Sequence, residues 1–184
     1  MIVIKPLTEA FPSSGFDTPK GRAASLLEAG SNYLATVEFL RHKNREIGPL
    51  FNVMLPSMHQ ALELLSKAVA YKVDPEFRPR NYSHGLLQLI TDYSNQAPVF
   101  QGIMARADAV ALIAALEQAY SGVRYGECFL SYDAEDHDLF VDIAYGLLAQ
   151  LHDLGFGFAF PHWISPEQRS RLADQLNAGD AEVG

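Results

Sequence analysis

Residues 59–72, HQALELLSKAVAYK, carry the clearest helical pattern in the chain. The apolar residues of this stretch recur at spacings of three and four, which is typical of one face of an α-helix. The same stripe extends towards the N-terminus through Met54 and Met58. We therefore predict a central helix from about Leu50 to Lys72, with Pro56 in its first turns or at a kink, because proline removes a helical donor.

Further helices are predicted on both sides of this segment. Residues that cap helix starts (Ser, Thr, Asp) precede most of the apolar repeats, and glycine follows several of them. Ser83, Asp108 and either Asp133 or Asp136 are the predicted caps of the third, fourth and fifth helices. The predicted ranges are about 18–45 for the first helix, 83–93, 109–120 and 133–154 for the third to fifth, and 165–177 for a polar, peripheral last helix. The sequence thus predicts an all-α fold.

The chain length favours one domain, since a domain of about 150 residues buries roughly 70% of its unfolded surface. Within residues 1–184 we expect an extended N-terminal segment (1–17), a helical bundle (18–154), and an aromatic loop with a peripheral helix (155–184). We expect the glycine-rich and aromatic segment Gly155–Trp163 either to pack over the bundle end or to form a dimer contact. We favour packing over the bundle.

Cysteine usage and hydropathy point to a cytoplasmic protein without a membrane segment. Cys128 is the only cysteine, so no internal disulfide can form, and the start MIVIKPL falls short of a secretory signal. The longest apolar run, AVALIAAL at 109–116, is far shorter than the roughly 20 residues of a membrane helix. Cys128 has no sequence-near base, so we interpret it as a small buried residue rather than a nucleophile.

Charge is distributed unevenly along the chain. The formal net charge is -8, yet residues 1–106 carry 11 Lys and Arg against 9 Asp and Glu, whereas residues 107–184 carry 3 against 13. The first part can therefore face an anion although the whole protein is acidic. The alternative is that both parts are ordinary solvated surfaces.

The stretch RPRNYSHGLLQLI, residues 78–90, raises the possibility of catalysis. A metal-free ribonuclease needs a histidine that exchanges a proton and an arginine that stabilises the anionic transition state. Arg78 and His84 are of these types, and Arg80 lies between them. The alternative is a solvated basic loop in which His84 only tethers the third helix.

The sequence resembles HEPN domains over roughly residues 20–152. Glu63, Leu64, Leu65 and Lys67 match the family's second helix, and His84 with Leu86, Leu87 and Ile90 is similar to its His-x-Leu-x-x-Leu element. Arg124 and Tyr125 look like the arginine–tyrosine pair that many members carry before the last long helix. The resemblance implies an antiparallel four- to five-helix up-and-down bundle. It also implies a homodimer associated with RNA, nucleotides, toxin–antitoxin pairs or nucleotidyltransferase partners.

Some HEPN proteins are ribonucleases, and their Arg-x4-6-His motif lies near the last long helix. Here the next histidine after Arg124 is His137, thirteen residues on, and Gly85 replaces the polar residue that commonly follows the family's histidine. The resemblance therefore favours a non-catalytic binding partner, and a metal-independent ribonuclease using His84 with Arg78 or Arg80 is the alternative. The residues expected to face an anion or nucleic acid are Lys67, Lys72, Arg78, Arg80 and His84.

Metal binding is a third hypothesis. Glu38 and His42 on the first helix, and His59 and Glu63 on the second, are each one turn apart, as in bundle metal centres. No further Glu-x-x-His pair completes a di-metal site, so no cofactor is expected. The acidic run YDAEDHD, which holds Asp133, Glu135, Asp136, His137 and Asp138, suits a hard cation. Acids at a helix start also cap free amides, and we prefer that interpretation. Arg124 either pairs with acids of the fifth helix or binds an anion.

Overall fold

The structure is a computed structural model that describes residues 18–47, 51–122 and 133–155. The described residues form helices and turns, so the all-α prediction is confirmed for them. The helices are α2 (Pro19–Ile47), α3 (Phe51–Val73), α4 (Leu86–Tyr93), α5 (Pro98–Met104), α6 (Ala107–Gly122) and α7 (Ala134–Asp153), with a short 3-10 helix at Pro79–Asn81. The predicted segment 1–17, the predicted helix at 165–177 and the aromatic segment beyond Gly155 lie outside the described residues.

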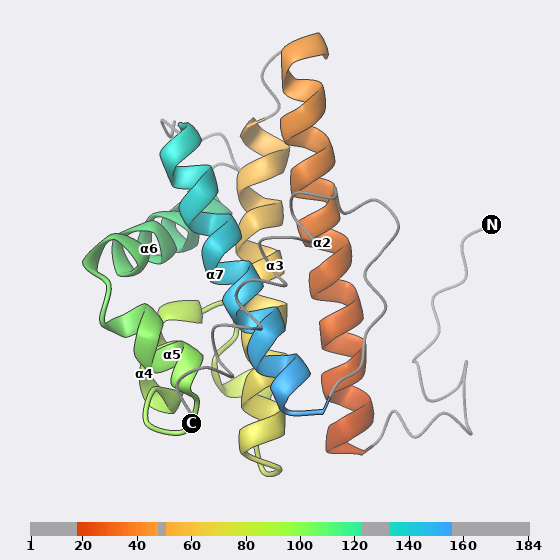
Figure 1. The fold of residues 1–184 in the computed structure, drawn as a ribbon, viewed down its shortest axis with the longest axis vertical. Helices are drawn as coiled ribbons and strands as arrows, with labels where there is room; N and C mark the ends of the chain where they lie inside the picture. Colours follow the sequence, from red (N-terminus) through yellow and green to blue (C-terminus); the bar gives the residue numbers. More distant parts are fainter. Residues whose placement is uncertain (1–17, 48–50, 123–132, 156–184) are drawn as a thin grey trace, which may run out of the picture.

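Helix α3 is central, as predicted, because α2, α4, α6 and α7 all pack against it. Figure 1 shows α2, α3 and α7 lying lengthwise, while α6 crosses at the side and the short α4 and α5 lie below it. Helices α2 and α3 run in opposite directions, and α7 runs in the same direction as α3 (Figure 1). The α2–α3 pair is therefore antiparallel, and the predicted up-and-down bundle of four to five helices is not confirmed.

The predicted stripe of α3 lies in the hydrophobic core. Its fully buried apolar side chains include Met58, Ala61, Leu62, Leu65, Ala68 and Val69. Helix α2 approaches this stripe closely at Gly30, where a Cβ atom would lie 2.9 Å from Leu65 Cγ and 3.1 Å from the Leu65 backbone nitrogen. A backbone atom cannot move aside as a side chain can, so glycine is needed at this contact. Close packing with α2 thus fixes the face that α3 turns towards α4 and α6.

The predicted cap of α7 agrees with the structure, whereas the predicted cap of α6 is wrong because that helix already begins at Ala107, and one helix was missed. Asp133 is the N-cap of α7, and its side chain and that of Asp136 each accept a backbone N–H of the other. Asp108 lies in the first turn of α6 and accepts the backbone N–H of Ala109 at 2.9 Å. Helix α5 was not predicted, although Pro98 stands in its first turn, where proline is favoured.

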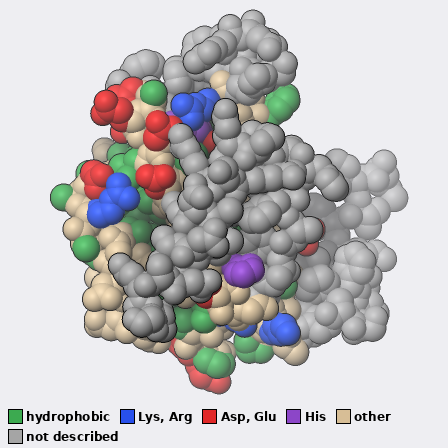
Figure 2. Space-filling model, in the orientation of Figure 1, with side chains coloured by type: hydrophobic (Ala, Val, Ile, Leu, Met, Phe, Trp, Pro, Cys, Tyr) green, Lys and Arg blue, Asp and Glu red, His purple; other side chains and the backbone are tan. Residues whose placement is uncertain are grey.

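Acidic side chains gather with basic ones at the upper left of the face in Figure 2, over α6 and the start of α7. Arg106 pairs there with Asp108 at 3.0 Å, and Arg41 of α2 pairs with Asp138 at 3.5 Å. Such exposed pairs contribute little to stability. They do neutralise part of the acidic second half of the chain.

Within the described residues, no single helix is long and apolar enough to cross a membrane. Helices α5 and α6 reach the required length and hydropathy only when taken together, and they are bent by 92° at the break between them.

Candidate functional site

The segment 74–85, which we call the arginine loop, joins α3 to α4 and is anchored through its aromatic residues. Phe77 is buried, with its ring centre 4.9 Å from that of Tyr71 and 5.6 Å from that of Tyr93. The Tyr93 hydroxyl donates to Asp74 Oδ2 at 2.7 Å. Burial and this hydrogen bond raise the pKa of Tyr93 above its ordinary value, so the phenol remains a donor. The first half of the loop is therefore held against α3 and α4.

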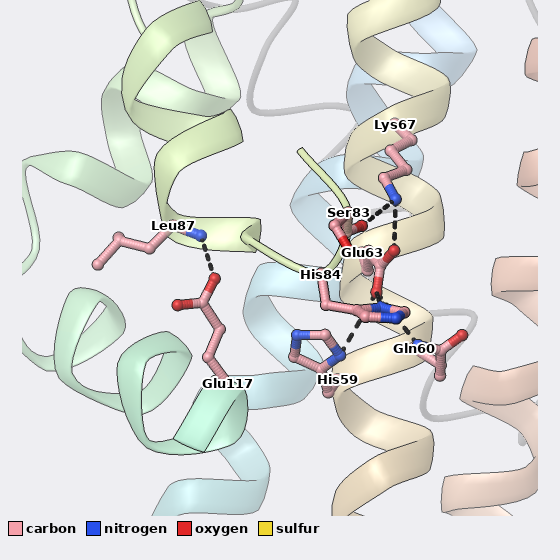
Figure 3. A network of polar contacts seen from close by, with 8 residues as sticks. All are labelled: His59, Gln60, Glu63, Lys67, Ser83, His84, Leu87 and Glu117. Atoms are coloured by element: carbon pink, nitrogen blue, oxygen red, sulfur yellow. Dashed lines mark hydrogen bonds and ion pairs between the residues drawn. The ribbon is translucent and has the colours of Figure 1, made fainter. Parts of the chain in front are cut away.

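The end of the arginine loop is tied to α3 by two polar contacts, which Figure 3 shows. Lys67 Nζ donates to the carbonyl oxygen of Ser83 at 2.7 Å, and His84 Nδ1 lies 3.1 Å from Glu63 Oε2. Ser83 has a φ of 45°, a left-handed conformation that costs a residue with a side chain roughly 1–2 kcal/mol. A strained residue held by specific contacts is frequent at functional sites.

Ser83 is not the cap of the third helix, so that prediction is wrong. Gly85 is the N-cap of α4, and it offers no side chain to the first turn. Glu117 of α6 accepts the backbone N–H of Leu87 at 2.8 Å instead (Figure 3). A first-turn amide of α4 is therefore satisfied by a side chain from another helix. His84 accordingly precedes α4 rather than lying in its first turn.

Glu63 lies at the centre of the polar network at the end of the loop. Its carboxylate is buried and forms an ion pair with Lys67, one helical turn along α3. Oε2 accepts the side-chain amide of Gln60 at 3.1 Å and faces His84 Nδ1 at the same distance. A buried charge needs such compensation, because an unpaired ion inside a protein costs several kcal/mol.

His59, one turn before Glu63, is fully buried, and neither of its ring nitrogens makes a hydrogen bond. Its Nδ1 lies 3.5 Å from Glu63 Oε2. The ring stacks on Tyr120 of α6, with centres 4.5 Å apart, and Tyr120 also lies 4.7 Å from the ring of His84. Burial lowers the pKa of His59, although Glu63 and the backbone of His84 partly oppose this. His59 is therefore neutral at neutral pH.

The carboxylate–imidazole pair gives His84 a definite chemistry. Its side chain is 56% exposed, so one edge of the ring faces solvent while Nδ1 faces Glu63. If Nδ1 carries the proton that Glu63 accepts, Nε2 keeps a free electron pair, as in oriented catalytic histidines. This arrangement suits a proton acceptor or a ligand contact at the surface.

The five residues expected to face an anion differ in how far their side chains are exposed. Arg78 and Arg80 are exposed, and neither guanidinium forms an ion pair with any residue that the structure describes. Lys67 is buried between Glu63 and Ser83, and so it lies away from the open surface. Lys72 is half-buried near the end of α3. Arg78, Arg80 and His84 are therefore the exposed basic side chains of the arginine loop.

Glu38, His59 and Glu63, the expected metal ligands whose side chains the structure describes, do not form one site. His137 Nε2 lies 2.8 Å from Glu38 Oε1, whereas Glu63 contacts His84 and Lys67. Among the residues described, no three His, Cys, Asp or Glu side chains are placed to hold a metal ion. The side chain of His42 lies outside the described residues, as do Arg124, Tyr125 and Cys128.

Sequence reasoning missed part of the network. Glu63 and Lys67 are spaced i, i+4, which indicates an ion pair on a helix, yet each was assigned to a different hypothesis. No sequence signal identified Tyr120 or Glu117, because both lie on α6 and meet the loop only through the packing of α6 on α3 and α4.

No protein-family model matches the chain, and no curated protein or solved structure is detectably similar to it. The indication of a function therefore comes from the chemistry of the arginine loop.

Proposed function

We propose that the chain binds phosphate groups of RNA or a nucleotide through the arginine loop and does not cleave them. As the resemblance to HEPN domains implies, we propose a homodimeric member with the family's up-and-down bundle. It acts beside a toxin–antitoxin-type or nucleotidyltransferase-type partner. Light scattering of the purified chain tests the dimer independently of RNA binding.

The observation that carries this proposal is exposed arginine on an anchored loop. Phe77, directly before Arg78, is buried, and the loop end is fastened through Ser83 and His84. An ordered loop loses less conformational freedom on binding than a flexible one. The guanidinium groups of Arg78 and Arg80 therefore lie on a loop that is already ordered before an anion binds.

The charges of the loop suit an oxyanion with several oxygens. Guanidinium groups bind phosphate through paired N–H donors, which a lysine ammonium does not offer. Lys67 and Glu63 neutralise one another beneath the loop, so they add little net charge to it. Glu76 is exposed on the same loop and repels anions. We therefore expect modest affinity that depends on salt.

A salt titration tests the proposal. Binding of single-stranded RNA should weaken between about 50 and 200 mM salt. In a plot of log affinity against log salt concentration, each phosphate contacted should contribute a slope near -0.7. Replacing Arg78 and Arg80 together by glutamine should reduce the magnitude of this slope by about 1.4, which corresponds to the loss of two phosphate contacts. Lys20→Gln, an exposed change on α2, is the matched control. The proposal is refuted if the wild type binds no RNA or nucleotide at low salt.

A second candidate, a metal-independent ribonuclease, is favoured by the contact between Glu63 and His84. In that reaction His84 Nε2 accepts a proton from the attacking hydroxyl, and Arg78 or Arg80 stabilises the charged phosphate. The buried carboxylate orients the ring, as in other carboxylate–histidine pairs.

Cleavage of RNA in the presence of a chelator distinguishes the two candidates. A ribonuclease loses its activity in His84→Ala and retains it in His152→Ala, which removes another exposed histidine. Cleavage that persists in His84→Ala indicates a contaminating nuclease. Binding without cleavage by the wild type supports the first proposal.

A further inference from the structure

Three side chains converge on one oxygen atom beneath the arginine loop. Glu63 Oε2 faces Gln60 Nε2 at 3.1 Å, His84 Nδ1 at 3.1 Å and His59 Nδ1 at 3.5 Å. A carboxylate oxygen offers two lone pairs. Gln60 and His84 occupy them, which explains why the buried imidazole of His59 makes no hydrogen bond.

We propose that Glu63 Oε2 is a proton-controlled latch: when His59 is protonated, it takes this oxygen from His84 and releases the arginine loop. The predicted effect on anion binding rests on the proposed function, whereas the latch itself does not. Acidification thus regulates the exposure and order of Arg78 and Arg80.

With neutral His59 the latch is closed. The imidazole lies inside the core against Tyr120, where a charge is poorly solvated and the neutral form is favoured. His84 then holds Glu63 and keeps Ser83 in its left-handed conformation together with Lys67.

With protonated His59 the contacts rearrange. The ionisable groups that face His59 in the described structure are Glu63 and Lys67 on α3, His84 on the loop and Tyr120 on α6. Glu63 is the carboxylate among them, so the new cation moves towards it. A charge-assisted hydrogen bond is shorter and about twice as strong as a neutral one, so protonated His59 competes for this oxygen more strongly than neutral His59 does. Of the two competitors, Gln60 lies on the same helix, whereas His84 can leave with its loop.

Strain in the loop favours its release. Ser83 has a φ of 45°, and left-handed backbone is costly for a residue with a side chain. Once His84 leaves Glu63, the bond from Lys67 to the Ser83 carbonyl and the contact of His59 with the His84 backbone still tie α3 to this part of the loop. The segment from Ser83 to Leu87 should then open more often.

Amide hydrogen exchange of residues 83–87 tests the latch in the full chain. After correction for the intrinsic pH dependence of exchange, opening should increase at least about fivefold from about pH 7.5 to about pH 5, where histidine titrates. His59→Phe keeps a ring against Tyr120 but has no nitrogen, and should abolish the increase. His152→Phe, an exposed change on α7, should leave it intact.

The direction of the change separates His59 from His84. Protonation of His84 itself strengthens its bond to Glu63 and would make the loop exchange more slowly in acid. Slower exchange, or an equal increase in wild type and His59→Phe, overturns the proposal. If His59→Phe does not fold, ring-nitrogen NMR of the wild type decides. Protonation of His59 must coincide with loss of the His84–Glu63 hydrogen bond, and retention of that bond refutes the latch.

RNA binding across the same pH range distinguishes the two proposals. A latch that opens in a chain with no RNA affinity refutes the proposed function alone. RNA binding with the same pH dependence in wild type and His59→Phe refutes the latch alone.

Discussion

Removing the charge of Glu63 should be among the most damaging single changes in the protein. The Glu63 and Lys67 side chains are 5% and 10% exposed, so water cannot screen either of them effectively. Glu63→Gln preserves the shape of the side chain but leaves the Lys67 ammonium buried without its counter-charge. Breaking a buried pair in this way costs about 3–5 kcal/mol, a large share of the roughly 5–15 kcal/mol that stabilises a typical domain.

A double-mutant cycle measured by urea unfolding tests this magnitude. Lys67→Met alone should cost a similar amount, because it leaves the Glu63 carboxylate buried without its ammonium partner. The combined variant should lose less than the sum of the single losses, by about 2–3 kcal/mol. Arg41→Ala, which breaks an exposed pair with Asp138, is the control and should cost at most about 1 kcal/mol. Additive losses, or a loss below about 1 kcal/mol for Glu63→Gln, would show that Glu63 and Lys67 do not form a buried ion pair.

Three further predictions concern the frame around the site. Gly30→Ala should destabilise the protein by about 1–3 kcal/mol, because the new methyl group meets the Leu65 backbone; Ala29→Gly on the same helix is the comparison, and equal losses would contradict the close contact. Asp133→Ala should cost about 1 kcal/mol through loss of the α7 cap, and Asp133→Asn should restore most of it; no loss in a thermal unfolding assay would exclude the capping role. Because the pKa of His59 is lowered in the folded state, the unfolded chain binds more protons just below the ordinary histidine pKa of 6.5. Stability should therefore fall as pH decreases below that value, by up to about 1.4 kcal/mol per pH unit from this residue, until the folded-state pKa is reached. His59→Phe should show a shallower pH dependence, and an unchanged slope would exclude His59 as the source.

The helices could be predicted because their signals are local. Apolar spacing located α3, and the acids at 133 and 136 located the start of α7. Ser83 shows the limit of this reasoning. Its residue type favours an N-cap, yet Glu117 satisfies a first-turn amide of α4 from another helix, and the backbone carbonyl of Ser83 accepts from Lys67.

The candidate site was predicted only in part because it depends on contacts between distant segments. His84 and Arg78 were identified by residue type, and both are exposed on the arginine loop. Sequence did not indicate that Lys67 is buried, since an i, i+4 pair has the same spacing on a solvated face. The stacking of His59 on Tyr120 joins residues 61 positions apart and follows from the packing of α6 on α3.

Titration of isotope-labelled protein with single-stranded RNA at low salt shows whether the arginine loop binds RNA. We predict chemical-shift changes at the guanidinium groups of Arg78 and Arg80 and at the ring of His84, lost in the double glutamine variant. Saturable shifts confined to α6 and α7, with none on the arginine loop, would show that the loop does not bind RNA.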